Sequence, residues 1–249
     1  MTVNSVNIIV PLKNEEKAIK NLVENLTPII KKTDKKINIS LIDDHSADNT
    51  LNILRQYEQK FDFIKAYKNG NPTGFGNALK FGIEKNQNEA IIIFMGDCSD
   101  SPDDILEYIK YFDEGYDCVF GSRFIKGSRV YDYPFVKLVL NRLANNFIRG
   151  LFFIKYNDIT NAFKGYKKKV LDECGPIISQ HFNINAELSL KSVVRGFKFK
   201  IIPISWTNRK KGRSKFHIKE MRNRYIFTIL YVFLEKFLLK EDLNKDNEY

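Results

Sequence analysis

Short apolar runs alternate with amphipathic segments along the first half of this chain, and no other feature constrains its fold as strongly. Segments with helical spacing of apolar residues separate the runs, and each connection is short. Such alternation predicts an α/β fold in which a parallel, doubly wound sheet is flanked by helices. The predicted strands are Val6–Val10, Ile37–Ile42, Phe61–Tyr67, Ala90–Met95 and Asp117–Gly121.

Composition is compatible with this prediction. The chain has 249 residues, of which 43% are hydrophobic and 28% charged, a balance typical of one globular α/β domain or two small ones. The cysteines Cys98, Cys118 and Cys174 are odd in number and have no histidine cluster near them, which argues for a reducing compartment rather than a disulfide framework or zinc site. We expect no signal peptide, because the first apolar run is short, and no membrane span, because no run reaches 18 residues.

Positive charge is concentrated near the C-terminus. The net charge is +10, and residues 195–224 hold eleven Lys or Arg against one acid, Glu220. Such a patch suits nucleic acid, anionic lipid or a phosphorylated substrate. Because it adjoins a hydrophobic segment and has no aromatic stacking platform, we expect no nucleic-acid partner.

Two predicted strands end in acidic residues. Asp97, Ser99 and Asp100 follow the fourth strand, where open α/β sheets bind ligands, and their oxygens suit Mg²⁺ or Mn²⁺ holding a diphosphate. Asp43 and Asp44 follow the second strand and can accept hydrogen bonds from a pyrimidine base or a ribose. In both places the alternative is that the residues only cap the next helix.

Gly74 and Gly76 lie in a turn without the spacing of a dinucleotide fingerprint or a P-loop. They either allow the backbone to approach a ligand or merely form the turn.

Several motifs in order resemble family 2 glycosyltransferases, in particular the dolichol-phosphate mannose synthase branch. The resemblance covers roughly residues 5–220 and rests on VPLKNE at 10–15, IDDHSAD at 42–48, Gly74-Phe75-Gly76, the Asp97 segment, GSRF at 121–124 and NRKKGRSKF at 208–216. It implies a nucleotide-sugar-binding fold of the GT-A type with a mostly parallel sheet. It also implies an Asp-x-Asp motif for Mg²⁺ or Mn²⁺ and inverting transfer of a sugar to an acceptor phosphate.

The resemblance also implies roles for individual residues. The nucleoside would be held by Pro11, Asn14, Glu15, Asp43, Asp44, Gly74 and Gly76, and the metal and diphosphate by Asp97 with Ser99 or Asp100. Phosphate clamps would be Arg123, Lys137, Arg209 and Lys215. The acceptor would also meet Arg142, Asn161, Lys164 and Glu187.

One departure concerns the metal motif. The family has Asp-Ala-Asp where this chain has Met95-Gly96-Asp97, so the first carboxylate is absent. Thioether sulfur is a poor ligand for Mg²⁺, and we expect Met95 to face the core. Either Asp97 holds the metal with the diphosphate, water and Asp100, or the enzyme depends less on metal.

Two segments have amphipathic character. The first, Lys137–Ile154, follows a predicted loop at Val130–Pro134, and it packs on the sheet or lies at a membrane interface. The second, Tyr225–Leu234, follows a basic cluster and suits an anionic membrane surface or a dimer interface. We therefore expect a catalytic domain over residues 1–220 and an amphipathic helix with a polar tail over residues 221–249.

These observations predict an inverting glycosyltransferase, peripheral on the cytoplasmic face of a membrane, that uses a dolichyl or undecaprenyl phosphate acceptor. Transfer to a sugar hydroxyl of a surface glycan is the alternative, and it would need Asp100 or Glu187 as a base. A non-catalytic membrane adaptor and a homo-oligomer also remain open.

Overall fold

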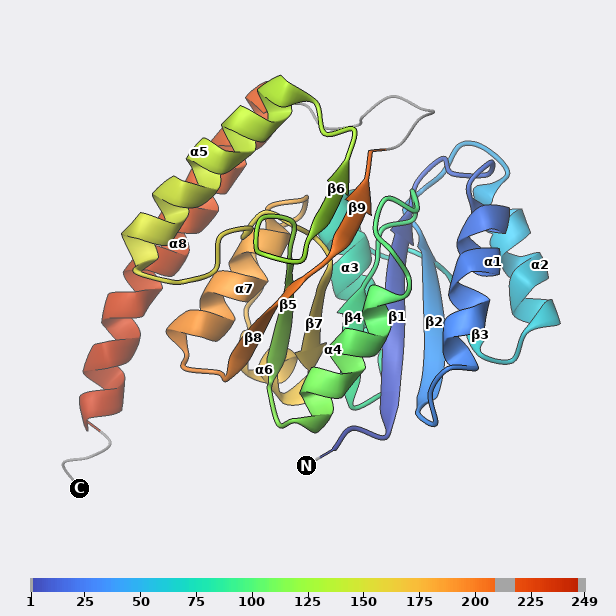
Figure 1. Ribbon diagram of the computed structural model, residues 1–249, viewed down its shortest axis with the longest axis horizontal. Coiled ribbons are helices and arrows are strands. Elements are labelled where there is room, and N and C mark those ends of the chain that lie inside the picture. Colours follow the sequence, from blue (N-terminus) through green and yellow to red (C-terminus); the bar gives the residue numbers. More distant parts are fainter. Residues whose placement is uncertain (1, 209–217, 246–249) are drawn as a thin grey trace.

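The computed structural model describes residues 2–208 and 218–245 and contains a seven-stranded mixed sheet with helices on both faces (Figure 1). The strand order is β3-β2-β1-β4-β7-β5-β8, and all neighbouring pairs are parallel except those of β7. The predicted α/β class is thereby confirmed. The strands are β1 (Ser5–Leu12), β2 (Lys36–Asp43), β3 (Ile64–Lys68), β4 (Ala90–Ile93), β5 (Cys118–Ser122), β7 (Lys164–Lys167) and β8 (Phe199–Pro203).

The helices form two layers with separate hydrophobic cores. One core lies between the sheet and α1, α2 and α4, and the other involves α3, α5, α6, α7 and α8. Because the central strands are apolar on both faces, they contribute alternate residues to the two cores, as Ile8 and Ile9 do. The helices are α1 (Ile19–Ile30), α2 (Thr50–Lys60), α3 (Phe75–Glu84), α4 (Asp104–Asp113), α5 (Phe135–Phe152), α6 (Lys168–Glu173), α7 (Ile184–Val194) and α8 (Ile218–Lys245).

The sheet is mostly parallel, as expected, and its one antiparallel strand among the described residues is β7. This strand pairs antiparallel with both β4 and β5, with Ile91 opposite Tyr166 and Val119 opposite Gly165. The segment Lys164–Lys167 has no apolar run that would mark a central strand. A Cβ atom at Gly165 would lie 2.7 Å from the Phe112 ring, so close packing against α4 explains the glycine.

A second, two-stranded sheet corrects the loop expected at Val130–Pro134. There β6 (Arg129–Tyr131) pairs in parallel with β9 (Ser205–Thr207), with Val130 opposite Trp206. The other side of β9 contacts the segment after β4, because Ser101 N donates to Ser205 O (3.0 Å) and Thr207 N to Ser99 O (2.9 Å). Backbone pairing with distant residues thus sets the position of Ser99–Ser101.

The helices α5 and α8 lie alongside each other beyond the edge of the sheet (Figure 1). Their contacts include the Phe152 and Phe233 rings, 5.7 Å apart, and a hydrogen bond from Lys236 Nζ to Phe152 O (3.3 Å). Over the described residues, no helix combines the length and hydropathy needed to cross a membrane. The helix α8 begins at Ile218 and is longer than the amphipathic segment predicted from the sequence.

Candidate functional site

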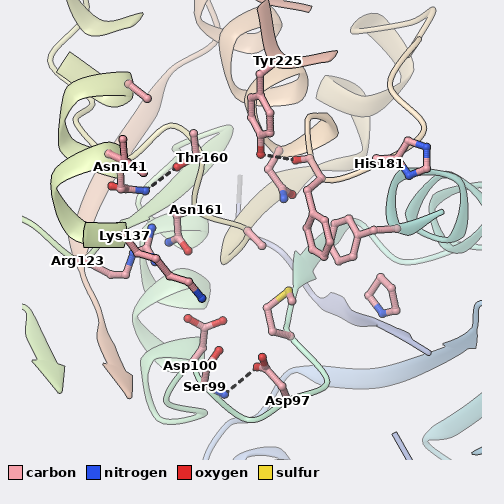
Figure 2. Close-up of a pocket in the computed structure, with 18 of the residues that line it drawn as sticks. Asp97, Ser99, Asp100, Arg123, Lys137, Asn141, Thr160, Asn161, His181 and Tyr225 are labelled. Atoms are coloured by element: carbon pink, nitrogen blue, oxygen red, sulfur yellow. Dashed lines mark hydrogen bonds between the residues drawn. The ribbon is translucent and has the colours of Figure 1, made fainter. Parts of the chain in front are cut away.

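A cavity of about 1240 Å³ lies beyond the carboxyl ends of β1 and β4 and extends between α5 and α8. Figure 2 shows Asp97, Ser99 and Asp100 at one end and Asn141, Thr160 and Tyr225 at the other, with Arg123 and Lys137 between them. The sequence-predicted residues that line it are Pro11, Glu15, Asp44, Gly74, Asp97, Ser99, Asp100, Arg123, Lys137 and Asn161.

Six other predicted site residues do not line this cavity, and two lie outside the described residues. Arg209 and Lys215 lie outside the described residues, so their roles as phosphate clamps stay predictions. The remaining predicted residues lie behind or beside the wall, namely Asn14, Asp43, Gly76, Arg142, Lys164 and Glu187.

Asp44 is the central polar residue of the wall formed after β2. Its side chain is nearly buried, and its carboxylate accepts hydrogen bonds from Gly74 N (2.9 Å) and Asn69 Nδ2 (3.0 Å). Lys13 Nζ lies 3.9 Å from its Oδ2. Asp44 therefore holds the Gly74 turn in place while lining the cavity.

Asp43 and Asn14 stabilise the backbone beside Asp44. Both Asp43 carboxylate oxygens lie 3.4 Å from Ser46 N, at the turn that leads into α2. Asn14 has a left-handed backbone with φ of 51°, and its Oδ1 accepts a hydrogen bond from Ala47 N (2.7 Å). Both residues thus shape the turns that surround the cavity.

The two predicted glycines are required by a contact within the chain. A Cβ atom at Gly74 would lie 2.5 Å from Gln180 O, and one at Gly76 would lie 2.6 Å from Gln180 C. Gly74 also has a positive φ of 147°, a backbone conformation that residues other than glycine rarely adopt. The glycines therefore allow the start of α3 to pack against residues 180–181.

Asp97 and Asp100 form the acidic end of the cavity. Asp97 Oδ1 accepts a hydrogen bond from Ser99 N (3.1 Å), while Asp100 is 3% exposed and its Oδ1 has no hydrogen-bond partner in the described part of the chain. Burial, followed by the charge of Asp97, raises the pKa of Asp100 to about 8. A divalent cation fits here, because it would compensate both the unpartnered oxygen and the repulsion between the carboxylates.

The expectation that Met95 faces the core is wrong, because Met95 is part of the cavity wall. The chain turns sharply at Gly96, where a Cβ atom would lie 2.6 Å from the Leu12 side chain. Within residues 2–208 and 218–245, no three His, Cys, Asp or Glu side chains gather as a metal-binding group. A cation at Asp97 and Asp100 would therefore need further ligands from a substrate or from water.

Arg123 supplies a permanent positive charge near Asp100. Its Nε and Nη2 donate to the two carboxylate oxygens of Asp158, at 2.9 and 2.8 Å. Burial alone would lower the pKa of Arg123, but the charge of Asp158 and its hydrogen bonds outweigh burial and raise it. The Tyr133 and Trp206 rings lie together beside the guanidinium, with centroids 5.4 and 5.6 Å from its carbon.

Lys164 was expected to contact the acceptor substrate, but its side chain does not line the cavity. It is fully buried, and its Nζ donates to Ile159 O (2.6 Å), Asn185 O (2.5 Å) and Ser189 Oγ (2.9 Å). With three acceptors for its three donors, the side chain ties the start of α7 to the segment that carries Asn161. Lys164 thus has a structural role in the fold, and its direct contact with the acceptor substrate stays a prediction.

Glu187 and Arg142 also have protein partners instead of cavity contacts. Glu187 is fully buried and accepts hydrogen bonds from Ile178 N (2.9 Å) and Ser179 N (2.8 Å). Arg142 Nη1 donates to Asn157 O (2.9 Å), and its guanidinium lies 4.4 Å from the Phe124 ring centroid. Both side chains therefore stabilise the fold, and their direct contacts with the acceptor substrate stay predictions.

The far end of the cavity is apolar and open. Phe147 of α5 is 67% exposed and Leu230 of α8 is 52% exposed, although both line the cavity. Tyr133, His181 and Tyr225 also line the cavity, although the sequence predicted no role for them at the site. His181 and Tyr225 had no local signal, because long-range packing alone brings them to the wall.

Comparisons with known proteins agree with this arrangement. The family model for glycosyl transferase family 2 matches residues 7–175. Over 217 residues the chain is 26% identical to a polyprenol monophosphomannose synthase of Mycolicibacterium smegmatis, covering 84% of this chain and 79% of that protein. It is also 25% identical to the uncharacterized glycosyltransferase YkcC of Bacillus subtilis, covering 86% of this chain and 64% of YkcC.

The fold resembles glucosyl-3-phosphoglycerate synthase of Mycobacterium tuberculosis. A crystal structure of that protein with Mn²⁺, uridine diphosphate and glucosyl-3-phosphoglycerate matches with a TM-score of 0.69 and 14% identity, covering 92% of this chain and 80% of the other. The sequence resemblance, the matched family model and the shared fold agree. The protein is therefore an enzyme of the GT-A fold and belongs to glycosyltransferase family 2.

Proposed function

We propose that this enzyme transfers a sugar from a nucleotide-sugar donor to a polyprenyl phosphate at an anionic membrane surface. The observation that carries the proposal is the continuity of one cavity, which runs from the acidic residues Asp97 and Asp100 to an exposed apolar trough between α5 and α8. A phosphorylated lipid has the matching chemistry, because its phosphate would lie near the donor and its chain along the trough. The polyprenol monophosphomannose synthase relative supports this choice of acceptor.

In the donor half, the nucleoside contacts Pro11, Glu15 and Asp44, and the diphosphate lies near Asp97 and Asp100. The fold relative with bound Mn²⁺ and uridine diphosphate supports a nucleotide here. Asp97 and Asp100 would hold Mg²⁺ or Mn²⁺, which neutralises charge on the diphosphate leaving group when bound. Asp100 Oδ1 supports this assignment, because it is buried and has no hydrogen-bond partner among the described residues.

In the acceptor half, Arg123 and Lys137 orient the phosphate of the lipid. A phosphate monoester is largely ionised at neutral pH, since its second pKa is about 6. Its oxygen attacks the anomeric carbon from the side opposite the diphosphate, so that a carbon–oxygen bond forms as the bond to the diphosphate breaks. Because the nucleophile is already an anion, these residues act by positioning and charge stabilisation.

Exposed apolar side chains support contact with a membrane. Of the large hydrophobic side chains exposed in the described chain, all except Tyr131 lie on α5 or α8 or directly after α5. Phe135, Phe153 and Phe227 are 77%, 90% and 64% exposed. A surface of this kind is typical of a protein that lies on a bilayer, and a dimer interface is the alternative.

Transfer to a sugar hydroxyl is a second candidate, favoured by Asp100. A hydroxyl nucleophile needs a base, and a carboxyl group with a pKa near 8 is well suited to accept its proton. The test is a radiolabelled transfer assay over a panel of nucleotide sugars with three acceptors: polyprenyl phosphate, polyprenol and a free sugar.

Product with polyprenyl phosphate alone supports the proposal. Efficient transfer to the sugar supports the second candidate. Absence of transfer across the whole panel would overturn both and favour the non-catalytic adaptor.

A further inference from the structure

Residues 175–183, here called the bridging loop, connect α6 to α7 and contact both α8 and the start of α3. Buried side chains of α7 hold the loop from below. Glu187 accepts hydrogen bonds from Ile178 N and Ser179 N, and Lys191 Nζ donates to the carbonyl oxygen of Pro176. The residues of α7 that hold the loop on this side, Glu187 and Lys191, do not line the cavity.

On its other side the bridging loop is attached to α8 by side-chain hydroxyl groups. Tyr225 Oη donates to Phe182 O (3.0 Å), a contact that Figure 2 shows at the cavity wall. Asn183 Nδ2 donates to Thr228 Oγ1 (2.9 Å), and Ser179 Oγ lies 3.3 Å from the same atom. Thr228 is fully buried, so these polar groups have little access to water as alternative partners.

The bridging loop also contacts the start of α3. Gln180 O accepts a hydrogen bond from Asn77 N (3.1 Å), and the Phe75 and Phe182 rings stack with centroids 4.4 Å apart. Among residues 2–208 and 218–245, no side chain caps the N-terminus of α3, so Gln180 O replaces a capping oxygen for one of its amides. The Gly74 amide, one residue before this helix, donates to Asp44.

Ion pairs that do not involve Tyr225 or Thr228 fix α8 against α7. Glu235 of α8 lies 3.6 Å from Lys191 Nζ and accepts a hydrogen bond from Arg195 Nε (3.0 Å). These contacts lie about two turns of helix beyond Thr228. Removing the hydroxyls of Tyr225 and Thr228 should therefore leave α8 docked while loosening the bridging loop.

We propose that Tyr225 and Thr228 are positioning residues for the donor half of the cavity. Through the bridging loop they fix the turn at Gly74 and the first residues of α3, and through Gly74 they fix Asp44. If binding to a membrane displaces α8, the bridging loop would thus change the position of the Gly74 turn and of Asp44 in the donor half. This inference rests on the proposed function only in taking the donor half to be the nucleotide site.

The test is hydrogen–deuterium exchange of the full chain, which needs no ligand. In the double variant Tyr225→Phe, Thr228→Val we expect amides of residues 74–80 and 178–183 to exchange about tenfold faster, while β1, β2 and α2 keep the wild-type rate. The matched control Tyr231→Phe removes a hydroxyl from the same helix, and its ring remains near Lys191 Nζ. A second double variant, Tyr225→Phe with Thr228→Ser, keeps the hydroxyl at position 228. Its amides should exchange more slowly than those of the first double variant.

Unchanged exchange at residues 74–80 would overturn the proposal, even if residues 178–183 exchange faster. Faster exchange throughout the sheet, already present in Tyr225→Phe alone, would also overturn the proposal. It would show that these hydroxyls stabilise the whole fold. With a donor that the wild type uses, KM for that donor should rise about three- to thirtyfold in the double variant, and kcat should change less than twofold. Failure of the wild type to transfer any sugar would refute the proposed function and leave the exchange result as the test of this inference.

Discussion

Asp158 holds Arg123 in a bidentate ion pair beside the cavity, with N–O distances of 2.9 and 2.8 Å. Asp158 is fully buried, and its Oδ2 also accepts a hydrogen bond from the Arg123 backbone N (3.0 Å). Three hydrogen bonds thus fix the direction in which the guanidinium points. The charge is held ready for an arriving substrate.

Arg123→Lys should therefore lower kcat/KM by about ten- to a hundredfold, or about 1.4–2.7 kcal/mol of transition-state stabilisation. An ammonium cannot reproduce the two-pronged pairing with Asp158. Steady-state kinetics with Lys126→Ala as control checks this, since Lys126 is an exposed cation that does not line the cavity. Equal activity of Arg123→Lys and wild type would show that the guanidinium is dispensable.

Asp97→Ala should abolish turnover, while Met95→Asp should be tolerated or should tighten Mn²⁺ binding. Met95 lines the cavity, so an aspartate there can provide a further oxygen ligand. Initial rates measured over a series of Mn²⁺ concentrations test both variants. An Asp97→Ala enzyme with near-normal kcat would refute the assignment of the acidic end as the diphosphate site.

Replacing Phe227, Leu230 and Leu234 by serine should release the protein from anionic liposomes without unfolding the sheet. These side chains are 64%, 52% and 62% exposed, so their loss removes little packing within the chain. Co-sedimentation at low salt provides the measurement, and Tyr131→Ser, a change at a side chain 55% exposed outside both helices, is the control. A wild type that stays in the supernatant and forms dimers would identify this surface as a subunit interface.

The stability of the fold should depend on pH through Asp104. Burial raises the pKa of Asp104 to about 6 from its ordinary value of 3.8, although its Oδ2 accepts a hydrogen bond from Ser205 N (2.6 Å). The folded state therefore binds this proton more tightly than the unfolded chain does. The free energy of unfolding should fall as pH rises from about 4 to about 6.

Asp104→Asn keeps an oxygen acceptor for Ser205 N and removes this titration. Urea denaturation at pH 4.5 and pH 7 should show a smaller loss of stability over this interval in the variant than in the wild type. An identical loss in both proteins would mean that Asp104 titrates at its ordinary pKa in the fold.

Lys164→Met should destabilise the fold by about 2–5 kcal/mol, because it removes three buried hydrogen bonds at once. Urea denaturation measures the effect, and Lys168→Met, at a cation on the surface of α6, is the matched control. An unchanged free energy of unfolding, combined with weaker activity toward the acceptor substrate, would instead support the predicted direct contact of Lys164 with that substrate.

The strands β1, β2 and β4 and the acidic residues that follow them could be predicted from the sequence. Their signals are local, since a buried parallel strand needs a short apolar run and the next helix needs a start. For this reason the sequence by itself was sufficient to place Asp44, Asp97 and Asp100 together, and all three line the cavity. Their place in the chain already put them at the carboxyl edge of a sheet.

Tertiary structure alone decided what surrounds these residues. Lys164 and Glu187 matched acceptor motifs by position, yet the chain directs both into the protein, where they form hydrogen bonds with backbone and side-chain groups. Tyr225 lies far from Asp97 in the sequence and still lines the same cavity. The physical reason is that a strand ending is encoded locally, whereas the direction of a side chain and the partner of a loop depend on which distant elements pack together.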